Sequence, residues 1–111
     1  MVADIITPED LNYMATELFG DMVKGVVDLD KGILALDAEL HSDLEAALLK
    51  DGSIQKNLWG INLYPGNTGE DYIEYDSMIN VRPASGNRSR TVEDPVIRGR
   101  IRALVKTRTG R

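Results

Sequence analysis

The fold is decided by residues 58–64, which read Leu58-Trp59-Gly60-Ile61-Asn62-Leu63-Tyr64. Large apolar side chains stand at Trp59, Ile61 and Leu63, and this period of two is typical of a strand with two distinct faces. A loop over residues 65–69 follows, and its proline and glycines favour a turn. A second alternating segment runs over residues 72–82 and ends at a proline, so we predict a hairpin of two strands.

Residues 22–38 are predicted to form another hairpin. The valine-rich segment 22–28 favours a strand, and residues 33–36 resume an apolar run. Between them Gly32 can adopt the left-handed conformation that a bulged turn requires. In an alternative interpretation, the next helix already begins at Ile33.

Capping signals predict three helices. The first covers residues 8–19, because Thr7 and Asp10 form a capping-box pattern and apolar side chains recur at helical spacing. The second follows Ser42 and ends before Gly52, with an earlier start at Asp37 as an alternative. The third begins after a cap at position 94 and buries position 101 at the centre of its apolar stripe, and we expect residues 107–111 to fray.

These elements follow the order α-β-β-α-β-β-α. Hairpins separated by helices indicate an α+β fold, with two β-hairpins forming one antiparallel sheet packed against about three helices. A length of 111 residues is typical of a single domain, which we assign to residues 1–111.

Composition excludes several classes of protein. The chain has no cysteine, so disulfides, thiolate metal sites and cysteine nucleophiles are excluded. Its apolar runs are far too short for a transmembrane helix, and its N-terminus lacks the pattern of a secretory signal. We therefore expect a soluble cytoplasmic protein with no membrane partner.

Charge is divided unevenly along the chain. Residues 1–76 carry 16 acidic and four basic side chains, whereas residues 77–111 carry two acidic and nine basic ones. The basic end can bind an anion, or it can pack against the acidic body within one chain or across a homodimer. A net charge of -5 argues against general adhesion to nucleic acid, so we expect no nucleic-acid partner.

His41 is the only histidine, and Glu39, Asp43 and Glu45 stand near it. An imidazole beside carboxylates can act as a general base or as a metal ligand. No second imidazole accompanies it, so we predict no metal site and no cofactor, although a site of oxygen ligands for a hard cation stays open. The alternative is a histidine bonded to the backbone or to a carboxylate at a helix entry.

Arginines gather in the loop before the last helix, where Arg82, Asn87, Arg88 and Arg90 surround a helix start. Guanidinium groups suit bidentate recognition of phosphate or carboxylate, and helix amides add donors. In the alternative, the same arginines bind Asp76, Glu93 or Asp94 within the chain.

Two further surfaces have candidate roles. Asn62 and Tyr64 share one face of their strand and could line a pocket with Tyr72 or Tyr75. On the last helix, a basic stripe is formed by Arg98, Arg102 and Lys106. Such a stripe is typical of either a nucleic-acid face or an ordinary solvated face.

Four segments together resemble a family of short prokaryotic proteins classified only as a domain of unknown function. They are residues 39–43, 58–65, 79–83 and 86–90, supported by Glu93-Asp94-Pro95. The resemblance covers nearly the whole chain and implies a stand-alone cytoplasmic domain. It brings no established activity, so no residue inherits a catalytic role.

The residues favour a binding or interaction module with an arginine-rich loop facing an anionic ligand or a protein partner. Its candidate surface combines His41, Asn62, Arg82, Asn87, Arg88 and Arg90. One alternative is an enzyme acting on a phosphate ester or RNA, with His41 as acid or base and Arg82, Arg88 and Arg90 stabilising negative charge. That alternative requires His41 to share a pocket with Arg82 or Arg88. The other alternative is nucleic-acid binding through the last helix.

Overall fold

The computed structural model describes residues 5–111, in which seven main elements follow the predicted order. They are α1 (Pro8–Leu18), β1 (Val23–Asp28), β2 (Ile33–Leu36), α2 (His41–Lys50), β3 (Leu58–Leu63), β4 (Ile73–Glu74) and α3 (Pro95–Thr109). The strands form one antiparallel sheet in the order β2-β1-β3-β4. The α+β class and the two hairpins are therefore confirmed, and Ile33 belongs to a strand.

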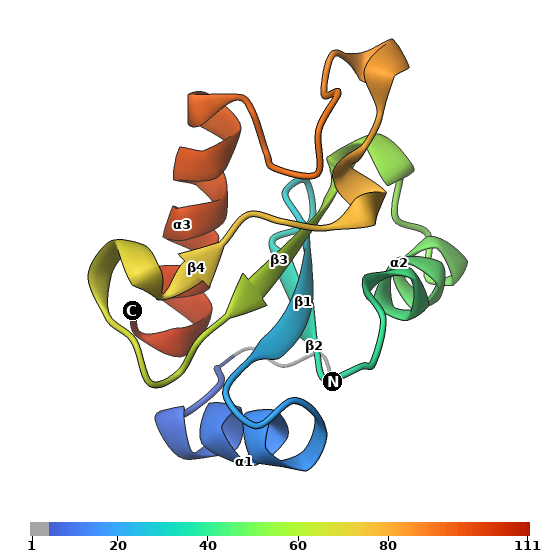
Figure 1. Ribbon diagram of the computed structural model, residues 1–111. Helices are drawn as coiled ribbons and strands as arrows, with labels where there is room; N and C mark the ends of the chain where they lie inside the picture. Colours follow the sequence, from blue (N-terminus) through green and yellow to red (C-terminus); the bar gives the residue numbers. More distant parts are fainter. Residues whose placement is uncertain (1–4) are drawn as a thin grey trace.

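The sheet lies between α2 on one side and α3 on the other, with α1 below one end (Figure 1). The larger apolar cluster contains Trp59, Ile61 and Leu63 of β3 together with Ile101 and Val105 of α3. The smaller cluster packs α2 against the opposite face and contains Val26, Leu44, Leu48 and Leu58. The alternation in residues 58–63 thus separates two cores, one on each side of the sheet. Within residues 5–111, no helix has the length and apolar character needed to cross a bilayer.

The predicted caps of α1 and α3 are present. The Thr7 hydroxyl accepts from the amide of Asp10, whose carboxylate accepts from the amide of Thr7, and Asp94 accepts from the amide of Val96. The prediction that residues 107–111 fray is wrong, because the hydroxyl of Tyr72 donates to Thr109 Oγ1 over 3.0 Å. Tertiary bonds of this kind leave no pattern along the sequence.

The predicted start of α2 is wrong by two residues. The helix begins at His41 after Leu40, which has no side-chain group to cap it, and neither Ser42 nor Asp37 is the N-cap. The reason is tertiary, since His41 Nε2 lies 2.7 Å from the carbonyl oxygen of Ile61 in β3. This bond fixes the helix entry and places Ser42 in the first turn.

The long strand predicted over residues 72–82 is also wrong. β4 ends at Glu74, and the chain continues through a bridge between Asp76 and Thr91 into a 3-10 turn at Met78–Asn80. This turn brings Ser77 over Gly60, where an added Cβ would lie only 2.5 Å from the Cβ of Ser77. The glycine within β3 therefore marks a close approach of a neighbouring segment.

Because β4 is short, side chains of the following segment bond to the backbone of β3 where a longer strand would pair with it. Asn80 Oδ1 accepts from the amide of Gly60 over 2.8 Å, and Asn80 Nδ2 donates to the carbonyl of Gly60 over 2.9 Å. The guanidinium of Arg82 donates to the carbonyl of Leu58. Buried backbone groups need such partners, which explains how β3 stays satisfied beyond its short neighbour.

Candidate functional site

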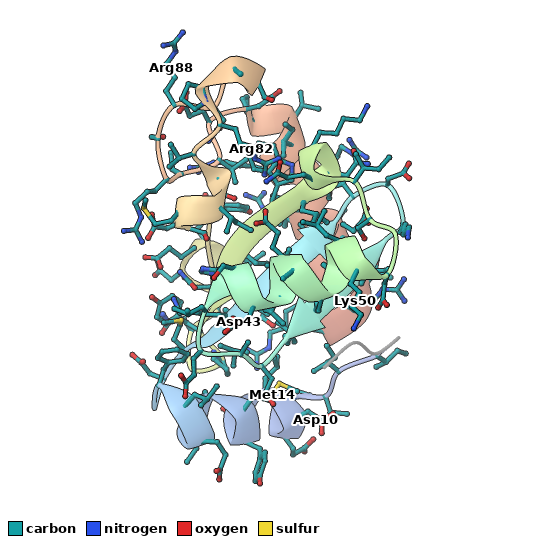
Figure 2. All side chains as sticks on the ribbon, turned by 90° about the vertical axis from the view of Figure 1, so that its right-hand side faces the viewer. Asp10, Met14, Asp43, Lys50, Arg82 and Arg88 are labelled. Atoms are coloured by element: carbon teal, nitrogen blue, oxygen red, sulfur yellow. The ribbon has the colours of Figure 1, made fainter. Side chains whose placement is uncertain are left out.

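The structure separates the six candidate residues into three places. His41 and Arg90 line one pocket, and Asn62 lies behind His41. Arg82 lines a different cavity together with Asn87. Arg88 is exposed at the tip of the loop, as Figure 2 shows.

The pocket of His41, here called the His41 pocket, has a volume of about 160 Å³. Four segments meet in it, namely β1, the start of α2, the turn after Asp76 and the arginine loop. The pocket combines two cations, an imidazole and two hydroxyl groups. Its lining residues are Lys24, Leu40, His41, Ser42, Ser77, Met78, Ile79 and Arg90.

His41 is 7% exposed, and burial lowers its pKa because a charged imidazole loses hydration there. The bond to the carbonyl of Ile61 opposes this shift. The positive charge of Lys24 lowers the pKa further, by more than the negative charge of Asp76 raises it. The imidazole is therefore neutral at neutral pH, with the hydrogen on Nε2 assigned from its carbonyl partner.

In the side-chain amide of Asn62 the nitrogen has hydrogen-bond partners among the described residues, whereas the oxygen has none. Its Nδ2 donates to Glu74 Oε1 over 2.8 Å and to the carbonyl of Asp76 over 3.2 Å. Its buried Oδ1 has no hydrogen-bond partner among the described residues. This oxygen is near enough to His41 to favour the charged imidazole, although it falls outside hydrogen-bonding geometry. His41 and Asn62 thus form one buried polar pair.

The pocket predicted around Asn62 and Tyr64 with Tyr72 or Tyr75 is not present. The hydroxyl of Tyr64 donates to Glu74 Oε1 over 3.1 Å, so Tyr64 and Asn62 share a carboxylate acceptor. Tyr72 and Tyr75 instead pack into the large apolar cluster on the α3 side of the sheet. Tyr72 has helical backbone angles at the end of a 3-10 turn, and Tyr75 packs against the same cluster as Ile73, so neither faces Asn62.

Arg90 forms a two-point ion pair with Asp76. Its Nε lies 3.1 Å from Asp76 Oδ1, and its terminal nitrogen lies 3.0 Å from Oδ2. The two side chains are 56% and 38% exposed, so water screens the pair. The interpretation of an internal carboxylate partner is confirmed for this arginine.

Arg82 binds carbonyl groups, not an anion. It donates to the carbonyl oxygens of Ile79 over 3.2 Å, Gln55 over 2.8 Å and Leu58, and its guanidinium lies 4.3 Å from the ring centroid of Trp59. Burial lowers its pKa, since the charged group loses water. These contacts use the fork of donors that an anionic ligand would need.

Asn87 and Glu93 hold the arginine loop from inside. Asn87 Nδ2 donates to the carbonyls of Asn80, Ser89 and Thr91, and its Oδ1 accepts from the amide of Glu93. Glu93 accepts from the hydroxyl and amide of Ser89 and from the amide of Arg88. These bonds lower the pKa of Glu93. The carboxylate of Glu93 thus occupies amide donors of the arginine loop, and that of Asp94 caps the helix start.

A model for a family described as a protein of unknown function, DUF5674, matches residues 1–108. The chain belongs to the DUF5674 family. No curated protein and no solved structure matches it. Within residues 5–111 of this DUF5674 protein, no three histidine, aspartate or glutamate side chains are grouped so that they could hold a metal ion.

The enzyme hypothesis lacks the geometry it requires in this DUF5674 protein. Neither Arg82 nor Arg88 lines the His41 pocket, and Figure 2 shows Arg88 pointing into solvent well away from Asp43 in the first turn of α2. The arginine that does reach His41 is Arg90. Lys24 and Ser77 were missed by sequence reasoning, although Ser77 gives a signal by interrupting an otherwise apolar alternation.

Proposed function

We propose that this DUF5674 protein is a binding module for a small oxyanion, a phosphate or carboxylate group, in the His41 pocket. The observation that carries the proposal is the convergence of Lys24, His41 and Arg90 with Ser42 in one pocket. Cations and hydroxyl donors of this kind recognise phosphate and carboxylate oxygens.

The start of α2 supports an anion at this place. Thr7 and Asp94 supply side-chain acceptors to the first-turn amides of α1 and α3, but Leu40 supplies none to α2. A helix N-terminus carries partial positive charge and free amide donors. An oxyanion in the pocket would therefore meet this charge in addition to that of Lys24, whereas Arg90 offers only the donors that Asp76 leaves free.

Lys24 gives the pocket its unpaired positive charge. Among the described residues, no carboxylate forms an ion pair with Lys24. The ammonium group of Lys24 lies 5.3 Å from the ring centroid of Phe19, a cation–π contact that brings no negative charge to it. An anion would supply that compensation.

The size of the pocket limits the ligand. A volume of about 160 Å³ is roughly five times the share of a water molecule in the liquid, which is room for an oxyanion and a short attached group. We infer a small metabolite, or one anionic group of a larger partner, as the occupant. Because the chain has no cysteine and no transmembrane helix in its described part, we further propose that it works in the cytoplasm.

A thermal-shift titration with phosphate, compared with chloride at equal ionic strength, tests the proposal. Phosphate should raise the melting temperature with a saturating dose response, because it binds only the folded state. Lys24→Gln should abolish the rise, and the matched control Arg88→Gln, which removes an exposed charge outside the pocket, should preserve it. A rise that never saturates, or that chloride reproduces, would contradict the proposal.

A further inference from the structure

We propose a second binding site, for a small organic anion with a flat apolar body such as a nucleoside monophosphate, in the cleft between α3 and the region of β4. This α3 cleft has a volume of about 410 Å³, within the range of small-molecule sites. Its lining comes from α3 and the region of β4, whereas that of the His41 pocket comes in part from the start of α2. Figure 1 shows α3 and α2 on opposite sides of the sheet. Its lining residues are Gly69, Glu70, Tyr72, Ile73, Tyr75, Arg102, Lys106 and Arg111.

The floor of the α3 cleft is apolar and firmly held. Tyr72 and Ile73 are buried in the large apolar cluster, and Tyr75 packs against it. The hydroxyl of Tyr72 bonds to Thr109, and the guanidinium of Arg111 lies 4.9 Å from the ring centroid of Tyr72. These contacts hold the floor in place, and Tyr75, which is partly exposed, is the aromatic side chain of the lining that a flat apolar group can reach.

The wall of the α3 cleft is cationic. Arg102 and Lys106 stand four residues apart on α3 and are exposed, so their side chains lie along the same edge of the cleft. No side-chain hydrogen bond or ion pair joins either of them to another residue of the described range 5–111. Arg111 adds a third positive charge to the lining, although its guanidinium also donates to the carbonyls of Pro65 and Asn67, and Glu70 is the acidic residue of the lining.

Arg98 lies on the same helix but differs from Arg102 and Lys106, because its side chain is hydrogen-bonded within the protein. Its guanidinium donates to the carbonyl of Val92 over 2.6 Å and to Thr91 Oγ1 over 2.6 Å, and it lies 4.7 Å from the ring centroid of Tyr75. The predicted basic stripe therefore contains two kinds of residue. Arg98 fixes the fold, while Arg102 and Lys106 are available to a ligand.

The charges favour a small ligand over a nucleic-acid strand. The whole chain carries a net charge of -5, which opposes the approach of a long polyanion. The cleft offers local positive charge beside an aromatic floor, so it suits a molecule with one anionic end and one apolar end. A nucleoside monophosphate has both parts within one small molecule.

Calorimetric titration with adenosine monophosphate, adenosine and inorganic phosphate tests this second site. Adenosine monophosphate should bind saturably, and removing either its phosphate or its nucleoside should weaken binding about tenfold or more. The double variant Arg102→Gln, Lys106→Gln should cause a similar loss, and both substitutions are on exposed positions that preserve the fold. Lys24→Gln should leave this binding unchanged, which separates the α3 cleft from the His41 pocket.

Three results would overturn the inference. The first is no saturable binding of adenosine monophosphate up to about 1 mM. The second is binding that the double variant retains while Lys24→Gln abolishes it, which would move the ligand to the His41 pocket. The third is an affinity that rises with oligonucleotide length, which would assign the cleft to a nucleic-acid strand. Arg88→Gln, which removes one exposed charge outside both sites, is the charge-matched control for Lys24→Gln and shows the effect of a lost surface charge in each titration.

Discussion

Replacing Arg82 by alanine should destabilise the protein by about 3 kcal/mol. The guanidinium donates to three carbonyl groups, of which those of Ile79 and Leu58 are partly buried and that of Gln55 is exposed. Loss of each partly buried bond, with its carbonyl then left without this partner, costs about 1 kcal/mol in all. The contact of the guanidinium with the ring of Trp59 adds about 1 kcal/mol. The exposed bond contributes little.

Urea denaturation of the wild type, Arg82→Ala, Arg82→Lys and Arg88→Ala measures this effect. Arg82→Lys should recover only a small part of the loss, because one ammonium group cannot reach three carbonyls and stack on a ring together. Arg88→Ala removes the same kind of side chain from an exposed position, so its free energy of unfolding should stay within about 0.5 kcal/mol of the wild type. A loss below about 1 kcal/mol for Arg82→Ala would refute the assignment of Arg82 as the residue that binds the edge of β3.

Four further predictions follow from packing, charge and titration. Ile101→Ala should cost about 2–5 kcal/mol in urea unfolding, since Ile101 is fully buried in the large cluster, and a loss below about 1 kcal/mol would contradict its place there. Gly60→Ala should be strongly destabilising because of Ser77, whereas Gly99→Ala, which has open space around it in α3, should stabilise by up to about 1 kcal/mol in the same assay. Burial lowers the pKa of His41 below its value in the unfolded chain. The free energy of unfolding should therefore fall as the pH drops below about 6.5, where only the unfolded chain gains the proton. The variant His41→Asn should flatten this part of the pH profile. Duplex DNA and RNA should show no submicromolar binding at physiological salt in a fluorescence-anisotropy titration.

Local signals predicted the helices and three of the strands. The caps at Thr7 and Asp94 act within one turn of their helices, and the alternation of residues 58–63 reflects two cores, so each pattern has a cause close in sequence. The long strand predicted over residues 72–82 failed because its cause is tertiary. Side chains of Asn80 and Arg82 satisfy β3 in place of backbone pairing, and no periodicity along the chain encodes that exchange.

The candidate site was predictable only in part. Residue type identified His41 and Arg90 as able to bind an anion, but it could not separate Arg90, which reaches the His41 pocket, from Arg82, which binds carbonyls. Lys24 joins the pocket through strand pairing, since it stands opposite Asn62 in the register of β1 and β3. The pairing of Lys24 with Asn62 can be predicted only when the register of the two strands is known, because the two residues are far apart in sequence.

A nuclear magnetic resonance titration of the single histidine tests the central claim most directly. The imidazole signals of His41 are unambiguous because the chain has no other histidine. Phosphate binding in the His41 pocket should shift these signals saturably and raise the pKa of His41, since a nearby anion favours the charged imidazole. Lys24→Gln should abolish both changes. Signals that move equally with phosphate and chloride at the same ionic strength, or that do not move at all, would contradict anion binding at this pocket.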